Sequence, residues 1–225
     1  PSVWNNTWGE GREDMIYKLA NLGFQSIMSN SSAFYFDMAD DKDMENSGLN
    51  WSGYVSYKDS WGTEPLNVFA NKVKLKNLGI GEAELRDKVY LNKNKRSNFL
   101  GIQSQLWTET ATDPYNFDRM LMPNMIVFSE RAWSSKEKWL EKASVREQED
   151  QQNISWNLFV NTIGQRHLPM LSSLNEELLF DLPKPGGIIE KGVLRVRQQF
   201  PGLEVRYTLD GNERNKNDTL YLVPK

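Results

Sequence analysis

The chain has 225 residues, with 27 basic and 30 acidic side chains, a formal net charge of −3 and no cysteine. This near balance of interspersed charge argues against a nucleic-acid or membrane-surface partner recruited by charge. The lack of cysteine excludes disulfides, thiolate metal sites and a cysteine nucleophile, and no apolar run approaches the roughly 20 residues of a membrane span. The length suits one sizeable domain with a small one, or part of something larger.

The first thirty residues predict a strand, a helix and a second strand. Residues 2–4 have the character of a strand end, and the turn-rich residues 5–11 lead into a helix predicted over residues 12–22. Apolar side chains recur in that helix at helical spacing, and Gly23 ends it. Residues 24–30 then predict the second strand. Together these elements form a βαβ unit.

Residues 101–109 predict a strand with two different faces, because side chains two residues apart share a face. Ile102 and Leu106 form an apolar face that would pack against helices. The other face is polar and carries Gln103, Gln105, Trp107 and Glu109. Such a strand fits a parallel barrel, in which one face meets a ring of helices and the other lines the lumen. We therefore expect its last residues at the rim of the barrel.

Trp107 stands two positions before the carboxylate of Glu109. A second pair with the same spacing, Tyr35 and Asp37, lies just past the predicted strand 24–30. Two such pairs near strand ends suggest one pocket. Aromatic faces beside carboxylates suit a sugar ring, which offers C–H faces to cover and hydroxyls that donate hydrogen bonds. The alternative is that Trp107 and Tyr35 are core aromatics with incidental acidic neighbours, and the pattern alone leaves both open.

Residues 38–98 predict a long, irregular and charged stretch with one short helix over residues 66–75. The stretch contains Trp51 and Trp61, and a long loop that bears aromatic residues is usually functional. The acidic residues at 40–43 lack the glycine and the distal glutamate of an EF-hand loop. We therefore expect a solvated loop there, without a metal site.

The helical part of the chain follows. A helix is expected to begin at Asp113 and to kink at Pro123, and Trp139 lies in a short amphipathic segment. Another helix is predicted over residues 153–171. The only histidine, His167, has no partner cluster, so we interpret it as a packing or hydrogen-bonded residue rather than a catalyst.

Composition changes at residues 182–187, which are rich in proline and glycine and predict a domain boundary. Beyond them, residues 193–197 and 203–208 alternate as strands joined through residues 201–202. Residues 220–223 add a possible third strand. Three strands are too few for a closed sandwich, so we expect this small β module to be cut short.

Several motifs stand in order along the chain: Trp4-Asn5-Asn6 and Gly11-Arg12-Glu13-Asp14-Met15, Ser29-Asn30 and Tyr35-Phe36-Asp37, residues 101–110 and Ser129-Glu130-Arg131-Ala132-Trp133, then Gly164-Gln165-Arg166 and Tyr207-Thr208-Leu209-Asp210-Gly211. In order and spacing they resemble the C-terminal half of bacterial β-N-acetylhexosaminidases of the chitobiase type, the family 20 glycoside hydrolases. The resemblance covers nearly the whole chain outside residues 60–97.

The resemblance implies an α/β fold, the C-terminal part of a (β/α)8 TIM barrel followed by a small all-β immunoglobulin-like domain. Residues 1–180 would be the barrel part and residues 181–225 the second domain. The strands that end at Trp4, Asn30 and Trp107 would be the sixth, seventh and eighth of the barrel, and the first five would be absent.

The resemblance also implies a role for Tyr35. It is similar to the tyrosine that hydrogen-bonds the substrate's acetamido oxygen while this oxygen attacks the anomeric carbon. A phenol suits this role because it can donate a hydrogen bond to a carbonyl oxygen. Tyr35 is therefore the predicted catalytic residue.

The same resemblance implies five substrate-binding residues. Asp37 and Glu109 are similar to the carboxylates that hold hydroxyls of the terminal sugar. Trp107 resembles the platform beneath that sugar, and Trp4 resembles a wall of the acetamide pocket. Trp51 resembles the tryptophan that flanks the next sugar. No cofactor is implied, and the expected substrates are oligosaccharides that contain N-acetylglucosamine.

In the resembled family the substrate's own acetamido group is the nucleophile, and a general acid protonates the leaving oxygen. That acid belongs to an Asp-Glu dipeptide at the fourth strand, and no Asp-Glu dipeptide occurs in this chain. We therefore expect that the chain needs the missing N-terminal half of the barrel and would not hydrolyse substrate alone. The resemblance implies a periplasmic, outer-membrane-associated or secreted enzyme.

Two other hypotheses belong to different classes. One is a non-catalytic carbohydrate-binding module that uses Trp107, Trp51 and Trp4 as platforms; binding without cleavage, even with the upstream half restored, would favour it. The other is a structural docking unit, in which these tryptophans fill a core; near-complete burial of Trp107 and Trp51 would support it.

Overall fold

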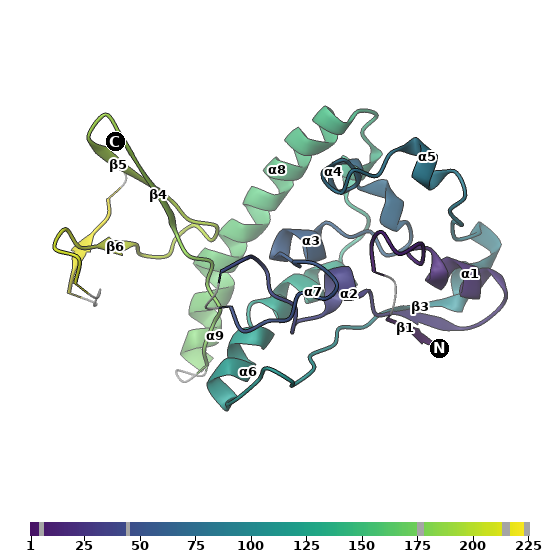
Figure 1. Ribbon diagram of the computed structural model, residues 1–225, viewed down its shortest axis with the longest axis horizontal. Coiled ribbons are helices and arrows are strands. Elements are labelled where there is room, and N and C mark those ends of the chain that lie inside the picture. Colours follow the sequence, from purple (N-terminus) through teal and green to yellow (C-terminus); the bar gives the residue numbers. More distant parts are fainter. Residues whose placement is uncertain (5–6, 44–45, 175–177, 213–216, 223–225) are drawn as a thin grey trace. The chain divides into compact units, whose positions relative to one another are not determined.

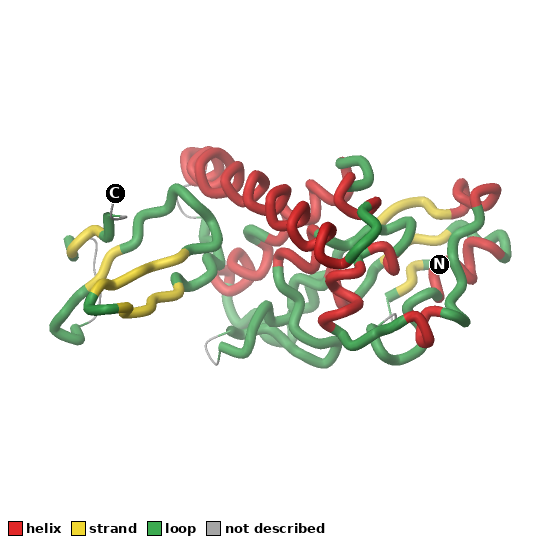
Figure 2. The backbone as a smooth tube through the Cα atoms, turned by 90° about the horizontal axis from the view of Figure 1, so that it is seen from above, coloured by secondary structure: helices red, strands yellow, loops and turns green. Residues whose placement is uncertain are grey.

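The computed structural model describes residues 1–4, 7–43, 46–174, 178–212 and 217–222 (Figures 1 and 2). Residue contacts divide the chain into two compact units, Pro1–Ile154 and Ser155–Lys225. The predicted turn residues Asn5 and Asn6, and Val223 of the possible last strand, lie outside the described residues.

The first unit contains a three-stranded parallel sheet with the order β1-β2-β3. Its strands are β1 (Ser2–Val3), β2 (Ser26–Met28) and β3 (Phe99–Ile102). Helix α1 (Met15–Asn21) connects β1 to the parallel strand β2, which confirms the predicted βαβ unit. In Figure 2 the three strands lie together, with their helices and loops around them.

The strand predicted over residues 101–109 is wrong in its extent, because β3 ends at Ile102. Its neighbour β2 also ends early, since Asn30 caps helix α2 (Ser31–Phe34) by accepting a hydrogen bond from the amide of Ser32 at 2.9 Å. Beyond that point no continuous partner strand is left for residues 103–109. Pairing continues only as an isolated bridge between Tyr35 and Gln105.

A hydrophobic core packs around this sheet. Its buried residues are Val3, Ile16, Tyr17, Met28, Ala33, Phe34, Val68 and Phe69. The buried Tyr17 hydroxyl accepts a hydrogen bond from the amide of Val68 at 2.8 Å and donates to the carbonyl of Pro65 at 2.9 Å. Because the hydroxyl is satisfied on both sides, it joins α1 to the middle segment without leaving a buried polar group unpaired.

The middle segment is irregular, as predicted, with short helical pieces. These are α3 (Tyr57–Trp61), η1 (Val68–Ala70), α4 (Lys72–Asn77), α5 (Glu82–Leu85) and η2 (Lys93–Asn98). The single helix predicted over residues 66–75 is wrong, because Asn71 interrupts it with non-helical backbone angles. Its side chain accepts a hydrogen bond from the amide of Lys74 at 3.0 Å and so begins α4.

Two helices replace the single kinked helix that was predicted from residue 113. Asp113 caps α6 (Pro114–Leu121) by accepting a hydrogen bond from the amide of Asn116 at 2.8 Å, which confirms the predicted start. The chain then leaves the helical conformation before Pro123, and α7 (Asn124–Trp133) begins after it. Proline disfavours a helical residue before it and lacks an amide donor, so the helix ends there.

The last long helix starts earlier than predicted. After η3 (Lys138–Glu141), helix α8 runs over Val145–Thr162, because Ser144 and Glu147 exchange backbone and side-chain hydrogen bonds at 3.0 and 3.2 Å. This is a capping box, a strong helix start. The helical path continues through a π-helical turn, η4 (Ile163–His167), into α9 (Leu168–Leu174).

The described strands of the second unit form two antiparallel pairs: β4 (Gly186–Glu190) with β5 (Val193–Arg197), and β6 (Arg206–Tyr207) with β7 (Thr219–Leu220). Strand β5 matches its prediction, whereas no strand is predicted over β4, whose two opening glycines fall in the predicted boundary at residues 182–187. Lys191 and Gly192 form the two-residue turn between β4 and β5, both with positive φ, as tight hairpins require. Strands 193–197 and 203–208 were expected to be joined as neighbours, and β6 instead pairs with β7.

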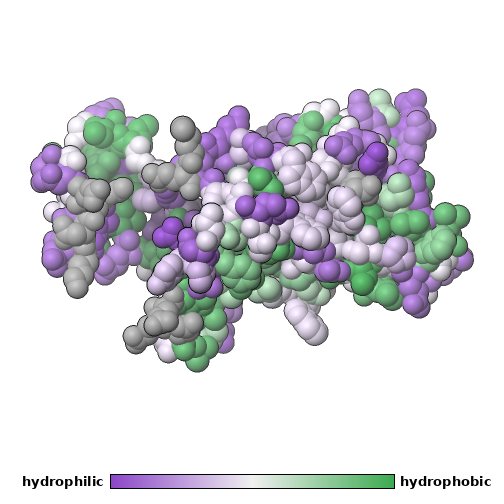
Figure 3. All heavy atoms as spheres, turned by 60° about the horizontal axis from the view of Figure 1, so that its bottom comes forward, coloured by the Kyte–Doolittle hydropathy of each residue, from purple (hydrophilic) through white to green (hydrophobic). Residues whose placement is uncertain are grey.

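Several large apolar side chains of the described residues are exposed, and on the face in Figure 3 apolar and hydrophilic side chains lie among one another. None of the described helices combines the length and the apolar character needed to cross a membrane.

Candidate functional site

All six residues predicted for the site line one cavity of about 600 Å³ in the first unit, here called the Trp107 cavity. Its lining residues are Ser2, Trp4, Tyr35, Asp37, Leu49, Trp51, Gln103, Gln105, Trp107 and Glu109. The volume lies within the range of small-molecule sites. The cavity opens at the carboxyl ends of the parallel strands, where β1 leads into Trp4 and β3 leads into Gln103.

Backbone hydrogen bonds fix the segment of Tyr35, Phe36 and Asp37. The amide of Phe36 donates to the carbonyl of Gln105 at 2.8 Å, and the carbonyl of Asp37 accepts from the amide of Leu49 at 2.7 Å. In extended backbone, successive side chains point to opposite sides. Tyr35 and Asp37 therefore line the cavity, while the Phe36 ring packs against Phe128 at 6.1 Å between centroids.

Residues 103–109 keep the alternation that was predicted for them, although they are not a strand. Gln103, Gln105, Trp107 and Glu109 all line the Trp107 cavity. The amide of Gln103 still donates to the carbonyl of Met28 at 2.8 Å. The cavity lining thus confirms that these four alternate side chains share one side. Only the continuous strand pairing is absent.

Two polar side chains at the base of the cavity are buried without a hydrogen-bond partner in the described part of the chain. Asp37 is 1% exposed and Tyr35 is 3% exposed, and neither carboxylate oxygen of Asp37 nor the phenol oxygen of Tyr35 has a formed hydrogen bond. A buried polar group without a partner costs free energy. Such groups in a cavity are satisfied when a ligand supplies the missing donors and acceptors.

The environment shifts both groups toward their protonated forms. Burial is the largest cause that raises the pKa of the Asp37 carboxyl; backbone amides of Asp37 and Trp107 oppose it, and the charge of Glu109 adds to it. Burial also raises the pKa of the Tyr35 phenol. The nearby Trp107 side chain lowers this pKa, and the charge of Asp37 raises it further. These Trp107 groups face the two oxygens without reaching the geometry of a formed hydrogen bond.

The three tryptophans of the cavity are open to solvent. Trp4 is 54% exposed, and Trp51 and Trp107 are each 50% exposed. The Trp51 ring meets the Tyr35 ring edge-on at 5.8 Å between centroids, so one tryptophan wall stands beside the buried phenol. The hypothesis that Trp107 and Trp51 fill a core is wrong for this unit, because both line an open cavity.

Ser2 and Leu49 were not predicted as site residues. Ser2 shares a hydrogen bond of 2.8 Å with the hydroxyl of Ser29, and the side-chain amide of Gln105 donates to the same hydroxyl at 3.4 Å. These contacts tie the ends of all three strands together beneath the cavity. Ser2 could have been found from its place in a strand parallel to residues 24–30, whereas Leu49 depends on a loop pairing that no sequence pattern indicates.

Within the described ranges, no group of three or more histidine, cysteine or acidic residues is arranged to hold a metal ion. The polar groups of the Trp107 cavity can accept and donate hydrogen bonds, and its indole faces can cover apolar C–H surface. The arrangement therefore suits a small neutral ligand with many hydroxyls.

Parallel strands, a connecting helix and a cavity at the strand ends define an α/β protein with its site at the carboxyl end of the sheet. The sequence model of the glycosyl hydrolase family 20 catalytic domain matches residues 2–136. The chain therefore belongs to glycosyl hydrolase family 20. A second sequence model, the chitobiase/beta-hexosaminidase C-terminal domain, matches residues 167–220.

Curated relatives carry related names. A "Beta-hexosaminidase" of Vibrio vulnificus is 27% identical over 97% of this chain and 27% of its own length. An "N,N'-diacetylchitobiase" of Vibrio harveyi is 28% identical over 89% of this chain and 23% of its own length. The chain thus spans about a quarter of the length of these relatives.

Among solved structures, a glycoside hydrolase family 20 β-N-acetylglucosaminidase aligns with a TM-score of 0.51 and 20% identity. The alignment covers 81% of this chain and 30% of that structure. This similarity supports the fold alone.

Proposed function

We propose that this chain forms the sugar-binding side of the active site of an exo-acting β-N-acetylhexosaminidase, which removes terminal N-acetylhexosamine from chitooligosaccharides. The observation that carries this proposal is the buried, unpartnered pair of Tyr35 and Asp37 at the base of a cavity walled by tryptophans. A sugar supplies both what these groups lack and the C–H faces that the indoles cover.

The proposed architecture follows from the same family membership. Strands β1, β2 and β3 would be the last three strands of an eight-stranded barrel formed in part by residues 1–180, and residues 181–225 would be an immunoglobulin-like domain. Parallel order and the cavity at the carboxyl ends support the barrel. The division by residue contacts lies earlier, between Ile154 and Ser155, within helix α8.

In the proposed reaction the acetamido oxygen of the substrate attacks the anomeric carbon, and the bond to the leaving oxygen breaks. Tyr35 donates a hydrogen bond to the acetamido oxygen and so orients it toward the anomeric carbon, while the oxygen gives up electron density to the new bond. The raised pKa of the phenol supports this role, because it keeps the proton on the donor. The wall formed by Trp4 would enclose the acetamido group.

Asp37 and Glu109 would accept hydrogen bonds from hydroxyls of the terminal sugar. Asp37 is buried and Glu109 is exposed, so the two carboxylates would hold the inner and outer parts of the same ring. Trp107 would lie beneath that ring as a platform, and Trp51 would flank the next sugar. Their half-exposed indoles support these roles.

The general acid that protonates the leaving oxygen is proposed to come from outside this chain. In the resembled family it belongs to an Asp-Glu dipeptide, which these 225 residues lack. Glu109 does not replace it, because the same resemblance gives Glu109 a binding role. The chain alone is therefore expected to bind N-acetylglucosamine without hydrolysing its glycosides, and the N-terminal part of the barrel would be its partner in catalysis.

Calorimetric titration with N-acetylglucosamine tests the binding site. We expect saturable binding that Trp107→Ala weakens, while Trp133→Ala, which removes an almost fully exposed tryptophan outside the cavity, leaves it unchanged. An equal response of the two variants, or no binding by the unaltered chain, would refute the proposed site.

A parallel assay on a chromogenic N-acetylglucosaminide tests the missing acid. Substantial turnover by the chain alone would show that the acid lies within it. Addition of the N-terminal half of the barrel is expected to give turnover. Binding that persists without turnover in the restored protein would favour a non-catalytic carbohydrate-binding module, which the same three tryptophans would also serve.

A further inference from the structure

A second cavity of about 450 Å³, here called the Trp8 cavity, shares Trp51 with the first one. Its walls come from the loop after β1, from the segment after Trp51 and from helix α4. It is lined by Thr7, Trp8, Glu10, Ser32, Trp51, Ser52, Gly53, Tyr54, Asp59, Lys74, Asn77 and Leu78. Of these lining residues, only Trp51 has a role predicted from the sequence.

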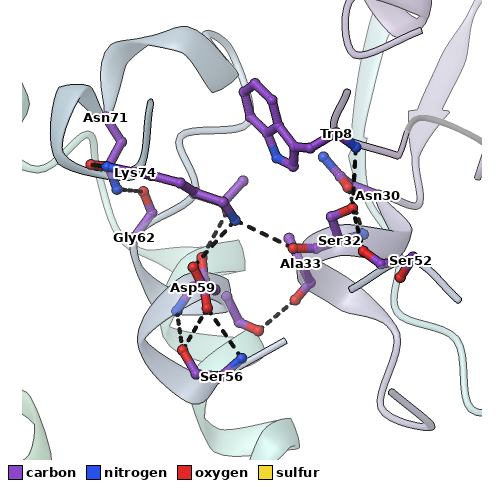
Figure 4. A network of polar contacts seen from close by, with 12 residues as sticks. Trp8, Asn30, Ser32, Ala33, Ser52, Ser56, Asp59, Gly62, Asn71 and Lys74 are labelled. Carbon is purple, nitrogen blue, oxygen red and sulfur yellow. Dashed lines mark hydrogen bonds and ion pairs between the residues drawn. The ribbon is translucent and has the colours of Figure 1, made fainter. Parts of the chain in front are cut away.

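The base of the Trp8 cavity is a network of satisfied polar groups. Figure 4 shows Lys74 reaching from its helix toward Asp59 and Ser32. Its ammonium lies 3.4 Å from a carboxylate oxygen of Asp59 and donates to the carbonyl of Ser32 at 3.3 Å. The other carboxylate oxygen of Asp59 accepts from the Ser56 hydroxyl at 2.6 Å. The positive charge is therefore already balanced inside the base.

The same network positions the wall of the cavity. The Lys74 ammonium lies 6.0 Å from the centre of the Trp8 ring, at the limit of a cation–π contact. The Trp8 amide donates to the Ser32 hydroxyl at 3.4 Å, and the Trp8 ring meets Phe69 edge-on at 5.9 Å between centroids. Trp8 is thus held at its backbone by Ser32 and at its ring by Phe69.

The lining residues of the Trp8 cavity that are open to solvent include aromatic and polar side chains, and the paired ammonium of Lys74 is not among them. Trp51 and Tyr54 are exposed aromatic residues, and Glu10 and Asn77 are exposed polar residues at the rim. Because Lys74 is paired with Asp59 and Glu10 adds a negative charge, an anion has little to gain here. Aromatic faces with an amide and a carboxylate suit a neutral ring that carries hydroxyl and amide groups.

We propose that the Trp8 cavity binds a further saccharide unit of the same oligosaccharide, beyond the sugar that Trp51 flanks. This inference rests on the proposed function, because it takes the occupant of the Trp107 cavity to be the terminal sugar. Trp51 lines both cavities, so the two are neighbours; in the proposed binding mode the saccharide chain continues past this ring into the second cavity. Oligosaccharides of three or more units are the class of substrate that the two cavities would hold.

Titration with β-1,4-linked mono-, di- and trisaccharides of N-acetylglucosamine tests this proposal. The trisaccharide is expected to bind about two- to tenfold more tightly than the disaccharide, as an added aromatic contact allows. Tyr54→Ala removes an exposed ring that lines only the Trp8 cavity of the two. It should reduce the trisaccharide affinity to that of the disaccharide and leave the two shorter ligands unchanged.

Tyr115→Ala is the matched control, since Tyr115 is an exposed tyrosine on α6 that lines neither cavity. Asn77→Ala provides a second variant that removes a polar contact without removing a ring. Equal affinities of the unaltered chain for the disaccharide and trisaccharide, or a uniform loss for all three ligands in Tyr54→Ala, would overturn the second site. Failure of the monosaccharide to bind would overturn the proposed function as well.

Discussion

Two groups of tryptophans in the first unit have the same chemistry and opposite surroundings. Trp61 and Trp139 are each 2% exposed and stack at 5.7 Å between centroids with 23° between their planes. Trp4, Trp51 and Trp107 are about half exposed around one cavity. The first pair stabilises the unit, whereas the second group leaves apolar surface in solvent. Residue type and nearby carboxylates do not separate the groups, since Asp59 and Glu141 stand two positions from the buried pair; the exposed fraction of the side chains does.

The largest difference between the two groups is expected in the free energy of unfolding when one of their tryptophans is replaced. Trp61→Ala should lower the free energy of unfolding by about 3–5 kcal/mol, because it leaves a cavity against Trp139. Trp107→Ala should change the same free energy by less than about 1 kcal/mol, since half of its side chain is already in solvent. Urea unfolding of the two variants compares them directly, and equal losses would remove the distinction.

The next largest effect is expected on sugar affinity. Asp37→Asn keeps the shape of the side chain and removes its charge, so it weakens the hydrogen bonds that sugar hydroxyls donate. Hydrogen bonds to charged groups contribute about 1.5–3 kcal/mol, which corresponds to roughly a 10- to 150-fold loss. Calorimetric titration with N-acetylglucosamine measures it. Asp118→Asn, an acidic residue on α6 away from the cavity, should bind as the unaltered chain does.

A smaller loss is expected for Tyr35→Phe, which removes only the hydroxyl. A neutral hydrogen bond contributes about 0.5–1.5 kcal/mol, or roughly a two- to twelvefold change in affinity. The loss should be seen with N-acetylglucosamine and not with glucosamine, which has no acetamido oxygen for the phenol to contact. Equal losses for the two sugars would place Tyr35 elsewhere on the ligand.

The smallest effect is expected on the pH dependence of stability. Burial raises the native pKa of Asp37 above its unfolded value, so the ionised carboxylate destabilises the native state. This penalty is absent below the unfolded pKa and complete above the native pKa. Asp37→Asn should therefore raise the free energy of unfolding at neutral pH, and the gain should vanish in the acid range. Unfolding curves across pH test this, and a gain that grows on acidification would contradict the assigned direction.

The composition of the cavity could be predicted because it depends on local alternation. Tyr35 with Asp37, and Trp107 with Glu109, are each two residues apart, and extended backbone brings such pairs to one side even where no regular strand forms. The Trp8 cavity could not be predicted in this way. It depends on Lys74 meeting Asp59 and Ser32, contacts between separate elements that leave no periodic signal.

The fold shows the same division between local and distant causes. The βαβ unit and the start of α6 at Asp113 follow from patterns and caps within a few residues. The early end of β3 depends on how far β2 extends beside it, and β4 depends on β5 as a partner because its two glycines carry no strand preference. Sequence reasoning that considers one segment at a time cannot anticipate such pairing.

Phe36 links the lining of the Trp107 cavity to helix α7. It stands between Tyr35 and Asp37 and packs with Phe128 of α7, which also contacts Phe34 edge-on at 5.5 Å between centroids. Phe128 thus packs behind the segment that carries both polar groups, although Phe128 itself lines no part of the cavity. Helix α7 therefore supports the wall of the cavity without contributing a residue to its lining.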